Sequence, residues 1–274
     1  MQRSILITGC SSGIGLAAAR AMRDRNWRVF ATARAAEDLE SLRRDEHLEP
    51  VHLELRDHRS IAACASEVIE KTGGRLDALF NNAAFGQPGA MEDLPTEALR
   101  DQFEVNVIGT HDLTRHLIPS LLCSDGGRIV QCSSVLGLIA APYRGAYCAS
   151  KFALEAMSDV LRIELENTRI AVSIIEPGPI NTRFIDGSLA AARRWINIPE
   201  SRHRSRYEAM IAALERGGKQ TFKLEPEAVA AKLVHAAEAR RPRRRYYVTT
   251  PTYMAAAARR ILPTSAIDWL AARN

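Results

Sequence analysis

The chain has 274 residues, of which 46% are hydrophobic and 25% charged, a composition typical of a soluble globular protein that can bury one core. Its net charge of +5 is modest and comes largely from arginines after Arg193, so charge alone does not indicate a nucleic-acid-binding protein. Five cysteines, an odd number without CxxC or CxxH spacing, argue against a disulfide framework and a zinc site; we expect reduced thiols and no metal.

No apolar run approaches the roughly 18 residues of a membrane span. The first residues enter a predicted strand directly, without the pattern of a signal peptide. We therefore expect a cytoplasmic protein.

Short β-rich runs alternate with helical patterns from the start of the chain to Phe80. The predicted strands are Ser4–Thr8, Arg28–Ala33, Val51–Leu55 and Leu76–Phe80, and the predicted helices are Ile14–Arg25, Glu37–Arg44 and Ile61–Thr72. This alternation is typical of βαβ units. The predicted fold class is α/β, a doubly wound parallel sheet with helices on both faces.

A glycine-rich turn, TGCSSGIG, joins the first strand to the first helix. Glycines at these spacings let the backbone approach a pyrophosphate, which the N–H groups and dipole of the following helix stabilise. The spacing differs from the commoner G-x-G-x-x-G, but its place between a strand and a helix favours a Rossmann-type nucleotide site. The candidate cofactor-binding residues are Thr8, Gly9, Ser11, Ser12, Gly13, Ile14 and Gly15.

The end of the second strand bears on which nicotinamide cofactor fits. An NAD site usually has a carboxylate there, about 20 residues beyond the glycines. This chain has Arg34 and no acid before Glu37. Because a guanidinium can pair a 2′-phosphate, we predict NADP(H) rather than NAD(H), the alternative being a solvated surface arginine. Glu54 and Leu55, at the end of the third predicted strand, are placed to contact the adenine, although a lone acid there is more often simply exposed.

Asparagines follow the fourth predicted strand and interrupt the next helix. In Asn81-Asn82-Ala83-Ala84 they can bond neighbouring strands and hold a loop open beside a cofactor, the alternative being an ordinary turn. Asn106 lies among apolar residues of a predicted helix over Leu99–Leu122. A buried amide needs partners, so we expect Asn106 to bind a backbone group or an ordered water, which is a structural role.

Tyr147 and Lys151 begin a predicted helix and share one of its faces. At an effective dielectric of about 20, a cation about 4 Å away favours phenolate by up to roughly 4 kcal/mol. We therefore expect a lowered pKa for Tyr147 and proton exchange near neutrality. Ser133 and Ser134 end the predicted strand Arg128–Cys132, where a hydroxyl could hold a substrate oxygen. Alone, a YxxxK pair occurs by chance in many helices.

Together these motifs resemble the compact, roughly 250-residue type of short-chain dehydrogenase/reductase. The sequence Thr8–Gly15 matches the family's TGxxxGxG, Asn81–Ala84 its NNAG with alanine for the last glycine, and Tyr147–Lys151 its YxxxK. Ser134 and Asn106 match the catalytic serine and asparagine, and Pro177-Gly178, after the predicted strand Ala171–Ile175, matches the PG motif. The similarity extends from about Ile5 to Thr182.

The resemblance implies a role for each matched residue. Tyr147 would protonate the carbonyl oxygen as hydride arrives, or take the alcohol proton in reverse, while Ser134 polarises that oxygen. Lys151 would lower the tyrosine pKa and bind the nicotinamide ribose, and Asn106 would position a relay water. Glu54 stands where the family has aspartate, and this difference weakens the expected contact with the adenine. The remaining implied cofactor contacts are Asn82, Ala83, Ala84, Tyr147, Lys151, Pro177, Gly178, Ile180 and Thr182.

The last third of the chain bears on the substrate. We expect a single domain over residues 1–274. The family resemblance implies that the segment 183–224, which is rich in apolar residues and has no clear strand, is a mobile lid over the substrate. The EPGPINT sequence and the residues after Ser134 are similar to the branch with 17β-hydroxysteroid and retinol dehydrogenases. We predict NADP(H)-dependent interconversion of an apolar alcohol (steroid, retinoid or aliphatic) and its ketone or aldehyde. The alternatives are a reductase of small polar carbonyls and a non-catalytic NADP-binding sensor.

Partners are less clearly indicated. The family resemblance implies a homodimer or homotetramer. The basic run Arg240–Arg245 lies between a predicted helix, Pro226–Ala239, and a predicted strand, Tyr246–Thr250. We interpret it as a solvated run and expect no nucleic-acid partner. The helical tail, 251–274, can pack on its own domain, on a partner subunit or at a membrane surface, and we favour these in that order.

Overall fold

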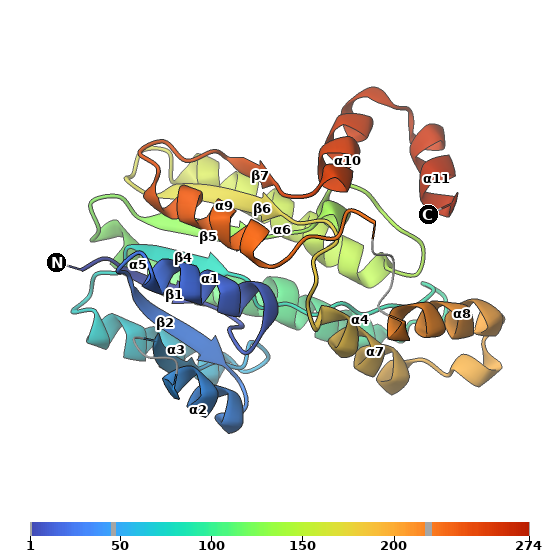
Figure 1. The fold of residues 1–274 in the computed structure, drawn as a ribbon, viewed down its shortest axis with the longest axis horizontal. Helices are drawn as coiled ribbons and strands as arrows, with labels where there is room; N and C mark the ends of the chain where they lie inside the picture. Colours follow the sequence, from blue (N-terminus) through green and yellow to red (C-terminus); the bar gives the residue numbers. More distant parts are fainter. Residues whose placement is uncertain (1, 45–47, 217–220, 274) are drawn as a thin grey trace.

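The computed structural model describes residues 2–44, 48–216 and 221–273. Seven parallel strands form one sheet in the order β3-β2-β1-β4-β5-β6-β7 (Figure 1). The strands are β1 (Ser4–Ile7), β2 (Arg28–Ala33), β3 (Leu48–His52), β4 (Ala78–Asn81), β5 (Arg128–Cys132), β6 (Ala171–Glu176) and β7 (Arg245–Tyr247). The order reverses between β1 and β4, where doubly wound sheets open a crevice at the carboxyl ends of their strands. The predicted α/β class is confirmed.

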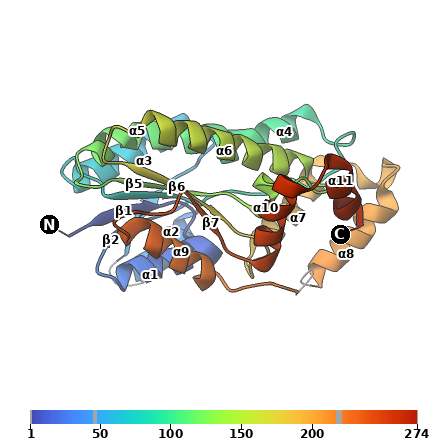
Figure 2. The same ribbon diagram turned by 90° about the horizontal axis from the view of Figure 1, so that it is seen from above.

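Helices cover both faces of the sheet (Figure 2). One face carries α1 (Gly13–Arg23), α2 (Ala36–Arg44) and α9 (Glu227–Glu238), and the other carries α3 (His58–Lys71), α5 (Thr110–Leu122) and α6 (Gly145–Glu164). Side chains of β1 alternate between the two cores: Ile5 and Ile7 pack with α1 and α9, whereas Leu6 packs with α3 and α5. Burial on both faces explains why the inner strands β1, β4 and β6 are rich in apolar residues.

The predicted boundaries hold to within a few residues, except at two strands. The third strand was predicted at Val51–Leu55 but is β3, Leu48–His52, because its pairing partner β2 ends at Ala33, opposite His52. The last strand was predicted at Tyr246–Thr250 but is β7, and Thr250 instead begins α10 (Thr250–Ile261). Arg245, which we predicted to be solvated with the rest of its basic run, pairs with β6 through its backbone and has a side chain only 26% exposed.

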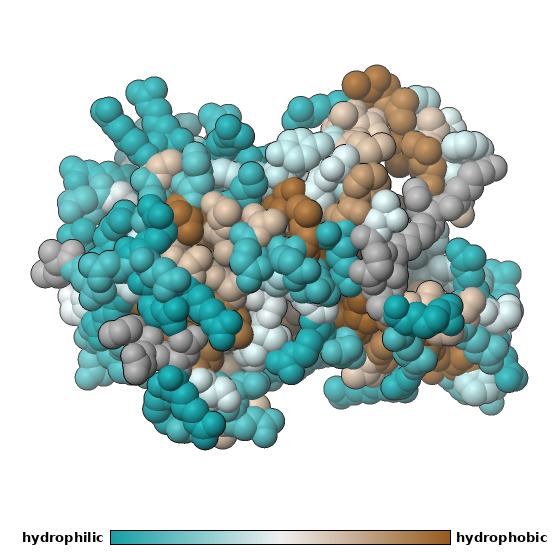
Figure 3. All heavy atoms as spheres, viewed as in Figure 1, coloured by the Kyte–Doolittle hydropathy of each residue, from teal (hydrophilic) through white to brown (hydrophobic). Residues whose placement is uncertain are grey.

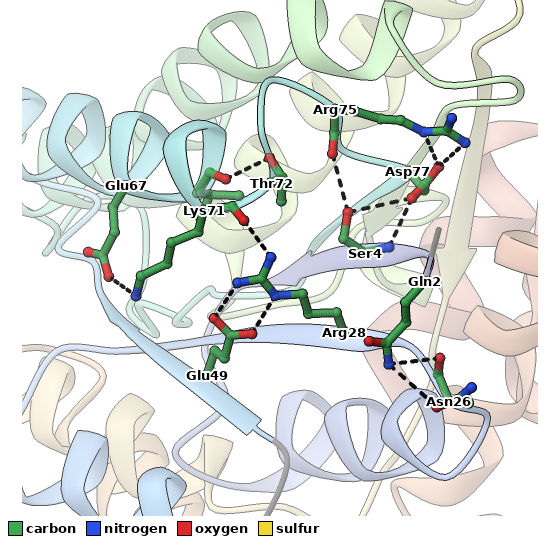
Figure 4. Close-up of polar contacts among 11 residues, drawn as sticks. Gln2, Ser4, Asn26, Arg28, Glu49, Glu67, Lys71, Thr72, Arg75 and Asp77 are labelled. Carbon is green, nitrogen blue, oxygen red and sulfur yellow. Dashed lines mark hydrogen bonds and ion pairs between the residues drawn. The ribbon is translucent and has the colours of Figure 1, made fainter.

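Ion pairs and hydrogen bonds link neighbouring strands at their amino ends (Figure 4). Asp77 accepts a hydrogen bond from the Ser4 N–H (2.9 Å) and pairs with Arg75 (3.2 Å). Arg28, at the start of β2, pairs with Glu49 of β3 (2.5 Å). These contacts tie the strand ends together on the side of the sheet opposite to the crevice.

The described part of the 183–224 segment is helical and contains no strand. It forms α7 (Phe184–Trp195) and α8 (Arg204–Glu215). Tyr207 of α8 is fully buried; its hydroxyl accepts from the Ala90 N–H (2.7 Å) and donates to Asp93 (2.8 Å). His203 contacts both Glu92 and the Tyr143 hydroxyl (3.1 Å for the latter). These bonds fasten α8 to the loop that follows β4.

The tail forms α10 and α11 (Thr264–Arg273). α10 packs on its own domain, our first-ranked option: Thr252, Ala255 and Ala256 are buried, and Arg259 donates to the Leu138 carbonyl (2.9 Å). Apolar residues gather on the outer surface of these two helices (Figure 3). The exposed ones are Tyr253, Met254, Ile261, Leu262, Trp269 and Leu270. Within the described ranges, no helix combines the length and apolar character needed to cross a bilayer.

Candidate active site

The predicted site segments meet at the carboxyl edge of the sheet because each follows the end of a parallel strand. The glycine-rich turn follows β1, Arg34 follows β2, Glu54 and Leu55 follow β3, Asn82–Ala84 follow β4, Ser134 follows β5, and Pro177, Gly178, Ile180 and Thr182 follow β6. Tyr147 and Lys151 lie on α6. Asn106 lies in the π-helical turn Glu104–Gly109, which joins α4 (Thr96–Phe103) to α5.

The glycine-rich turn fits a pyrophosphate. Gly9 and Gly13 adopt φ values of +73° and +56°, which side chains other than glycine rarely allow. A Cβ at Gly9 would lie 3.0 Å from the Cβ of Ala83. Ser12 caps α1 with extended backbone but makes no side-chain capping bond. The first N–H groups of α1 therefore remain available to an anion, as a dinucleotide requires.

Asn82 fastens this turn to the end of β4. Its side-chain amide donates to the Thr8 carbonyl (2.9 Å), and the backbone N–H groups of Asn82 and Ala83 both donate to the Thr8 hydroxyl (2.9 Å each). The neighbouring Asn81 donates to Thr114 (2.8 Å). The prediction that these asparagines bond neighbouring strands holds for Asn82, whose amide reaches the residue that follows β1, whereas Asn81 bonds a residue of α5 instead.

Arg34 and Glu54 lie together at the end of the site where the adenosine would bind. The Arg34 side chain is 68% exposed, and its Nη1 lies 3.8 Å from Glu54 Oε2. The other carboxylate oxygen of Glu54 accepts the Arg56 N–H (3.0 Å). Because an exposed pair at this distance is weak, the Arg34 guanidinium can turn to another anion at little cost.

A cavity of about 510 Å³ opens beside the turn. It is lined in part by Ser12, Gly13 and Thr182 of the predicted set, with Arg183 beside them. Arg183 donates to the Ser11 carbonyl (3.1 Å), so the start of the 183–224 segment is anchored to the glycine-rich turn.

Ser134, Tyr147 and Lys151 come together in the interior. Tyr147 is 9% exposed and Lys151 is 3% exposed. The Lys151 ammonium donates to the Cys132 carbonyl (2.7 Å) and lies 5.7 Å from the centre of the Tyr147 ring. Ser134 shares a hydrogen bond with Tyr147 and accepts the Leu136 N–H (3.1 Å). A hydroxyl, a phenol and an ammonium thus occupy one small volume.

The expected lowering of the Tyr147 pKa is wrong for this structure. Burial raises the pKa of Tyr147 above its ordinary value, although the Ser134 hydrogen bond and the Arg144 charge act in the opposite direction. Burial also lowers the pKa of Lys151, against smaller opposing effects of Cys132 and Glu155. Removal from water disfavours the charged form of each group, and for both groups this effect outweighs the opposing ones.

Asn106 binds backbone, as one of our two options predicted. Its amide donates to the Phe85 carbonyl (2.9 Å) and to the Ser150 hydroxyl (3.2 Å), and its side-chain oxygen accepts the Phe85 N–H (3.2 Å). The π-helical turn around it follows a geometry that recurs at functional sites. Asn106 therefore joins the loop after β4 to the helix that carries Tyr147.

Two contributors were not predicted. Gln102, fully buried, accepts the Gln87 N–H (2.7 Å) and donates to the Phe85 carbonyl (2.9 Å), which fixes the same loop. The Phe184 ring lies 5.5 Å from the Tyr147 ring, at 59° to it. In the sequence, nothing distinguishes Phe184 from the other apolar residues of the 183–224 segment. The identity of the ring that covers Tyr147 depends on a tertiary contact that local spacing does not show.

Comparison with known proteins gives matches over the whole fold. A family model described as short chain dehydrogenase matches residues 3–191. The uncharacterized oxidoreductase YbbO of Escherichia coli is 41% identical over 268 residues, covering 98% of this chain and 93% of that protein. Human 17-beta-hydroxysteroid dehydrogenase type 1 is 34% identical over 262 residues, covering 89% of this chain and 77% of that protein.

Solved structures with the same fold also match this chain. A short-chain dehydrogenase from Streptomyces avermitilis matches with a TM-score of 0.80 and 29% identity, covering 100% of this chain and 94% of the other. A short chain dehydrogenase/reductase from Burkholderia phymatum, solved in complex with NAD, matches with a TM-score of 0.79 and 25% identity, covering 98% and 95%.

Proposed function

The chain belongs to the short chain dehydrogenase family, near its 17β-hydroxysteroid dehydrogenase branch, and we propose that it is an NADP(H)-dependent oxidoreductase that interconverts an apolar alcohol and its ketone or aldehyde. The observation that carries the proposal is the meeting of Ser134, Tyr147 and Lys151 at the carboxyl edge of a nucleotide-binding sheet. Proton exchange at the phenol beside hydride transfer is the chemistry that this arrangement supports.

The cofactor would be held by the residues predicted from the sequence. The N–H groups at the start of α1 would bind the pyrophosphate, Arg34 the 2′-phosphate, and Lys151 the nicotinamide ribose. Glu54 and Leu55 would border the adenine, while Pro177, Gly178, Ile180 and Thr182 border the nicotinamide. When bound, NADP(H) supplies or accepts the hydride.

The protein's own groups would handle the proton. With its pKa raised by burial, Tyr147 keeps its proton at neutral pH, which is the form that protonates a carbonyl oxygen. Ser134 would hold and polarise that oxygen from the other side. Lys151 would return a proton toward Tyr147 and exchange it through a water positioned by Asn106. In the reverse direction the same groups would remove the alcohol proton.

The surroundings of Tyr147 favour an apolar substrate. Phe184 lies against the Tyr147 ring, and behind it α7 and α8 form a third hydrophobic cluster with the loop after β4. The buried members of this cluster are Ala90, Ala192, Ile196 and Tyr207. This apolar packing holds α7, and with it Phe184, beside Tyr147, and the Phe184 ring offers no hydrogen-bond partner to a hydroxylated sugar or a small acid. We propose that the 183–224 segment acts as the substrate lid.

The proposed function is tested with the purified protein, NADPH or NADH, and a panel of carbonyls. Steroid ketones, retinal and medium-chain aldehydes represent the apolar class, and short hydroxylated carbonyls the polar class. We expect faster NADPH oxidation with the apolar members. Turnover only with polar members would support the alternative reductase, and tight NADPH binding without any turnover would support a sensor.

Replacing Arg34 by alanine tests the cofactor preference. A charge-assisted hydrogen bond contributes about 1.5–3 kcal/mol, so we expect the KM for NADPH to rise roughly 10- to 100-fold while that for NADH changes little. Glu54 would then face the 2′-phosphate without Arg34 between them, which adds to the loss. The matched control is Arg43→Ala, another exposed arginine with one weak ion pair. Equal losses for the two cofactors would refute Arg34 as the phosphate-binding residue.

We also propose that the protein is a homodimer or homotetramer. The outer face of α6 exposes three apolar side chains, Met157, Val160 and Ile163, and Ile108 is exposed on the adjoining π-helical turn. Light scattering of the full chain at micromolar concentration would show a single monomeric mass if this proposal is wrong.

A further inference from the structure

Beneath the proposed active site, three carboxylates converge on one guanidinium. Arg245 of β7 reaches Glu176 at the end of β6 (2.7 Å) and Asp159 of α6 (2.6 Å), and it also contacts Glu155 of α6. The same nitrogen, Nη1, bonds both Glu155 and Glu176. The two N–H groups of this one nitrogen serve both carboxylates, which brings Glu155 and Glu176 close together.

Glu155 and Glu176 lie out of water, whereas Asp159 does not. Their side chains are 9% and 0% exposed, against 38% for Asp159. Oε2 of Glu176 is buried without a hydrogen-bond partner, and Oε1 of Glu155, which makes no hydrogen bond either, has the Ser133 hydroxyl near it. Two adjacent buried carboxyl groups with unsatisfied oxygens are poorly suited to carry two full negative charges.

The titration behaviour agrees with this geometry. Burial and, second to it, the neighbouring Glu155 charge raise the pKa of Glu176 to about 8, against the opposing effect of Arg245. Burial also raises the pKa of Glu155 above its ordinary value, against the opposing effects of Ser133 and Arg245.

The proximity of the two buried carboxyl groups favours one proton on the pair. Ionising both would place two negative charges beside the same guanidinium nitrogen, in a site where Glu176 Oε2 has no donor. One proton removes one of these charges, supplies an O–H donor, and leaves a single negative charge facing Arg245. Asp159 does not enter this balance, because it has Arg162 as a second counter-ion.

The other ionisable groups that face the cluster do not alter this balance. Arg162 is engaged by Asp159 on the outer side. The Tyr247 phenol and the Cys132 thiol have pKa values raised by burial, so both are neutral near pH 7. Arg260 of α10 acts on Tyr247.

We propose that Glu155 and Glu176 share one proton over Arg245, and that the single negative charge left on this pair positions and keeps protonated the Lys151 ammonium. Glu155 and Glu176 are positioning residues, since neither touches the reacting atoms. The cluster is joined to the active site through the chain itself: Glu155 shares α6 with Lys151, Ser133 precedes Ser134, and Glu176 precedes Pro177. The shared proton stands independently of the proposed function, whereas the effect on Lys151 rests on it.

Thermal unfolding of Glu176→Gln from pH 5 to pH 9 tests the shared proton without any activity. A carboxyl group whose pKa is raised from 4.5 to about 8 by folding destabilises the fold progressively as pH rises between those values. Glutamine does not titrate and mimics the protonated acid. The Tm of the variant relative to wild type should therefore rise from pH 5 to pH 8 and then level off. Glu40→Gln, an exposed glutamate in a weak pair, should give a flat difference.

The opposite slope would overturn the shared proton. If Glu176 were ionised in the fold and stabilised by Arg245, the variant would lose Tm relative to wild type, and the loss would deepen above pH 5. Glu155→Gln provides a second test in case Glu176→Gln misfolds, because it also removes the titration of the pair. The double variant should lose far more Tm than the sum of the two single variants, because it leaves Arg245 with Asp159 alone.

The pH profile of kcat tests the link to Lys151. In Glu155→Gln the single negative charge passes to Glu176 on β6, and the carboxylate that raises the pKa of Lys151 is lost, so the Lys151 ammonium should lose its proton at lower pH. The alkaline limb of the kcat profile should move down by about one pH unit. Glu176→Gln leaves the charge on Glu155 and should move the limb less. Equal limbs in wild type and Glu155→Gln would overturn the positioning role while leaving the Tm result, and hence the shared proton, standing.

Discussion

Replacing Tyr147 by phenylalanine is expected to lower the rate of carbonyl reduction by about 1000-fold or more. General acid catalysis by a positioned group typically contributes 10²- to 10⁴-fold, and this change removes only the hydroxyl that would supply the proton. The ring would stay buried between Lys151 and Phe184. NADPH binding, measured by fluorescence titration, should therefore remain within a few-fold of wild type.

The matched control is Tyr143→Phe. Tyr143 lies four residues before Tyr147 and just before the start of α6. Its hydroxyl contacts His203 (3.1 Å) and not the proposed catalytic groups. We expect a small loss of thermal stability and turnover within several-fold of wild type. Full turnover by Tyr147→Phe would refute the mechanism, and equal collapse of both variants would indicate general damage to α6.

The second large effect is expected from Gly15→Ala in the glycine-rich turn. An added Cβ would overlap the Gly9 carbonyl oxygen, far inside the van der Waals distance, and would lie 2.8 Å from the Asn82 side-chain nitrogen. Backbone must move to relieve this overlap, and overpacking of this kind typically costs about 1–3 kcal/mol. Because the moving backbone is the one that would face the pyrophosphate, we expect NADPH affinity to fall by about 10- to 100-fold, with a lower Tm.

Gly187→Ala provides the control for this change. Gly187 lies within α7, and a Cβ there would meet no atom within 4 Å. Alanine favours helix over glycine by about 1 kcal/mol, so this variant should bind NADPH normally and be as stable as wild type or more so. Unchanged NADPH affinity in Gly15→Ala would mean that the cofactor does not approach this turn.

The alternation of strands and helices was readable from the sequence because parallel strands buried on both faces are short and apolar. The end of β3 could not be predicted in this way, because Val51, Leu53 and Leu55 continue the same alternation of apolar residues. Pairing, rather than side-chain pattern, ends that strand: its partner β2 stops at Ala33, and only the Leu53 N–H still reaches back to the Ala33 carbonyl (3.0 Å).

Motifs in the sequence predicted the site residues, but they did not predict the direction of the pKa shift of Tyr147. The expected low pKa of Tyr147 assumed a phenol in contact with water, and burial reverses the direction. That burial depends on segments far along the chain, including the Phe184 ring. Spacing within one helix specifies which groups are neighbours, but the number of water molecules around them is a property of the whole fold.

Arg245 illustrates the same limit. In sequence it is the last of a dense basic run, for which solvation is the ordinary outcome. In the structure it pairs inward with residues 69, 86 and 90 positions away. The signal that could have indicated this was the spacing of Lys151, Glu155 and Asp159 at four-residue intervals on α6, which places two acids in line behind the lysine.

The position of Arg245 near the end of the chain also has a consequence for folding during synthesis. The residues proposed to bind cofactor and substrate end at 224, and every strand up to β6 is complete at Glu176, yet the cation that balances Glu155 and Glu176 is made only at residue 245. Until then, closing α6 onto β6 would bury two acids without their counter-ion, so both would have to take up a proton, and the closed state is less favourable before β7 is made. Truncated products lacking β7 should remain open and be degraded rather than persist as partly active enzyme.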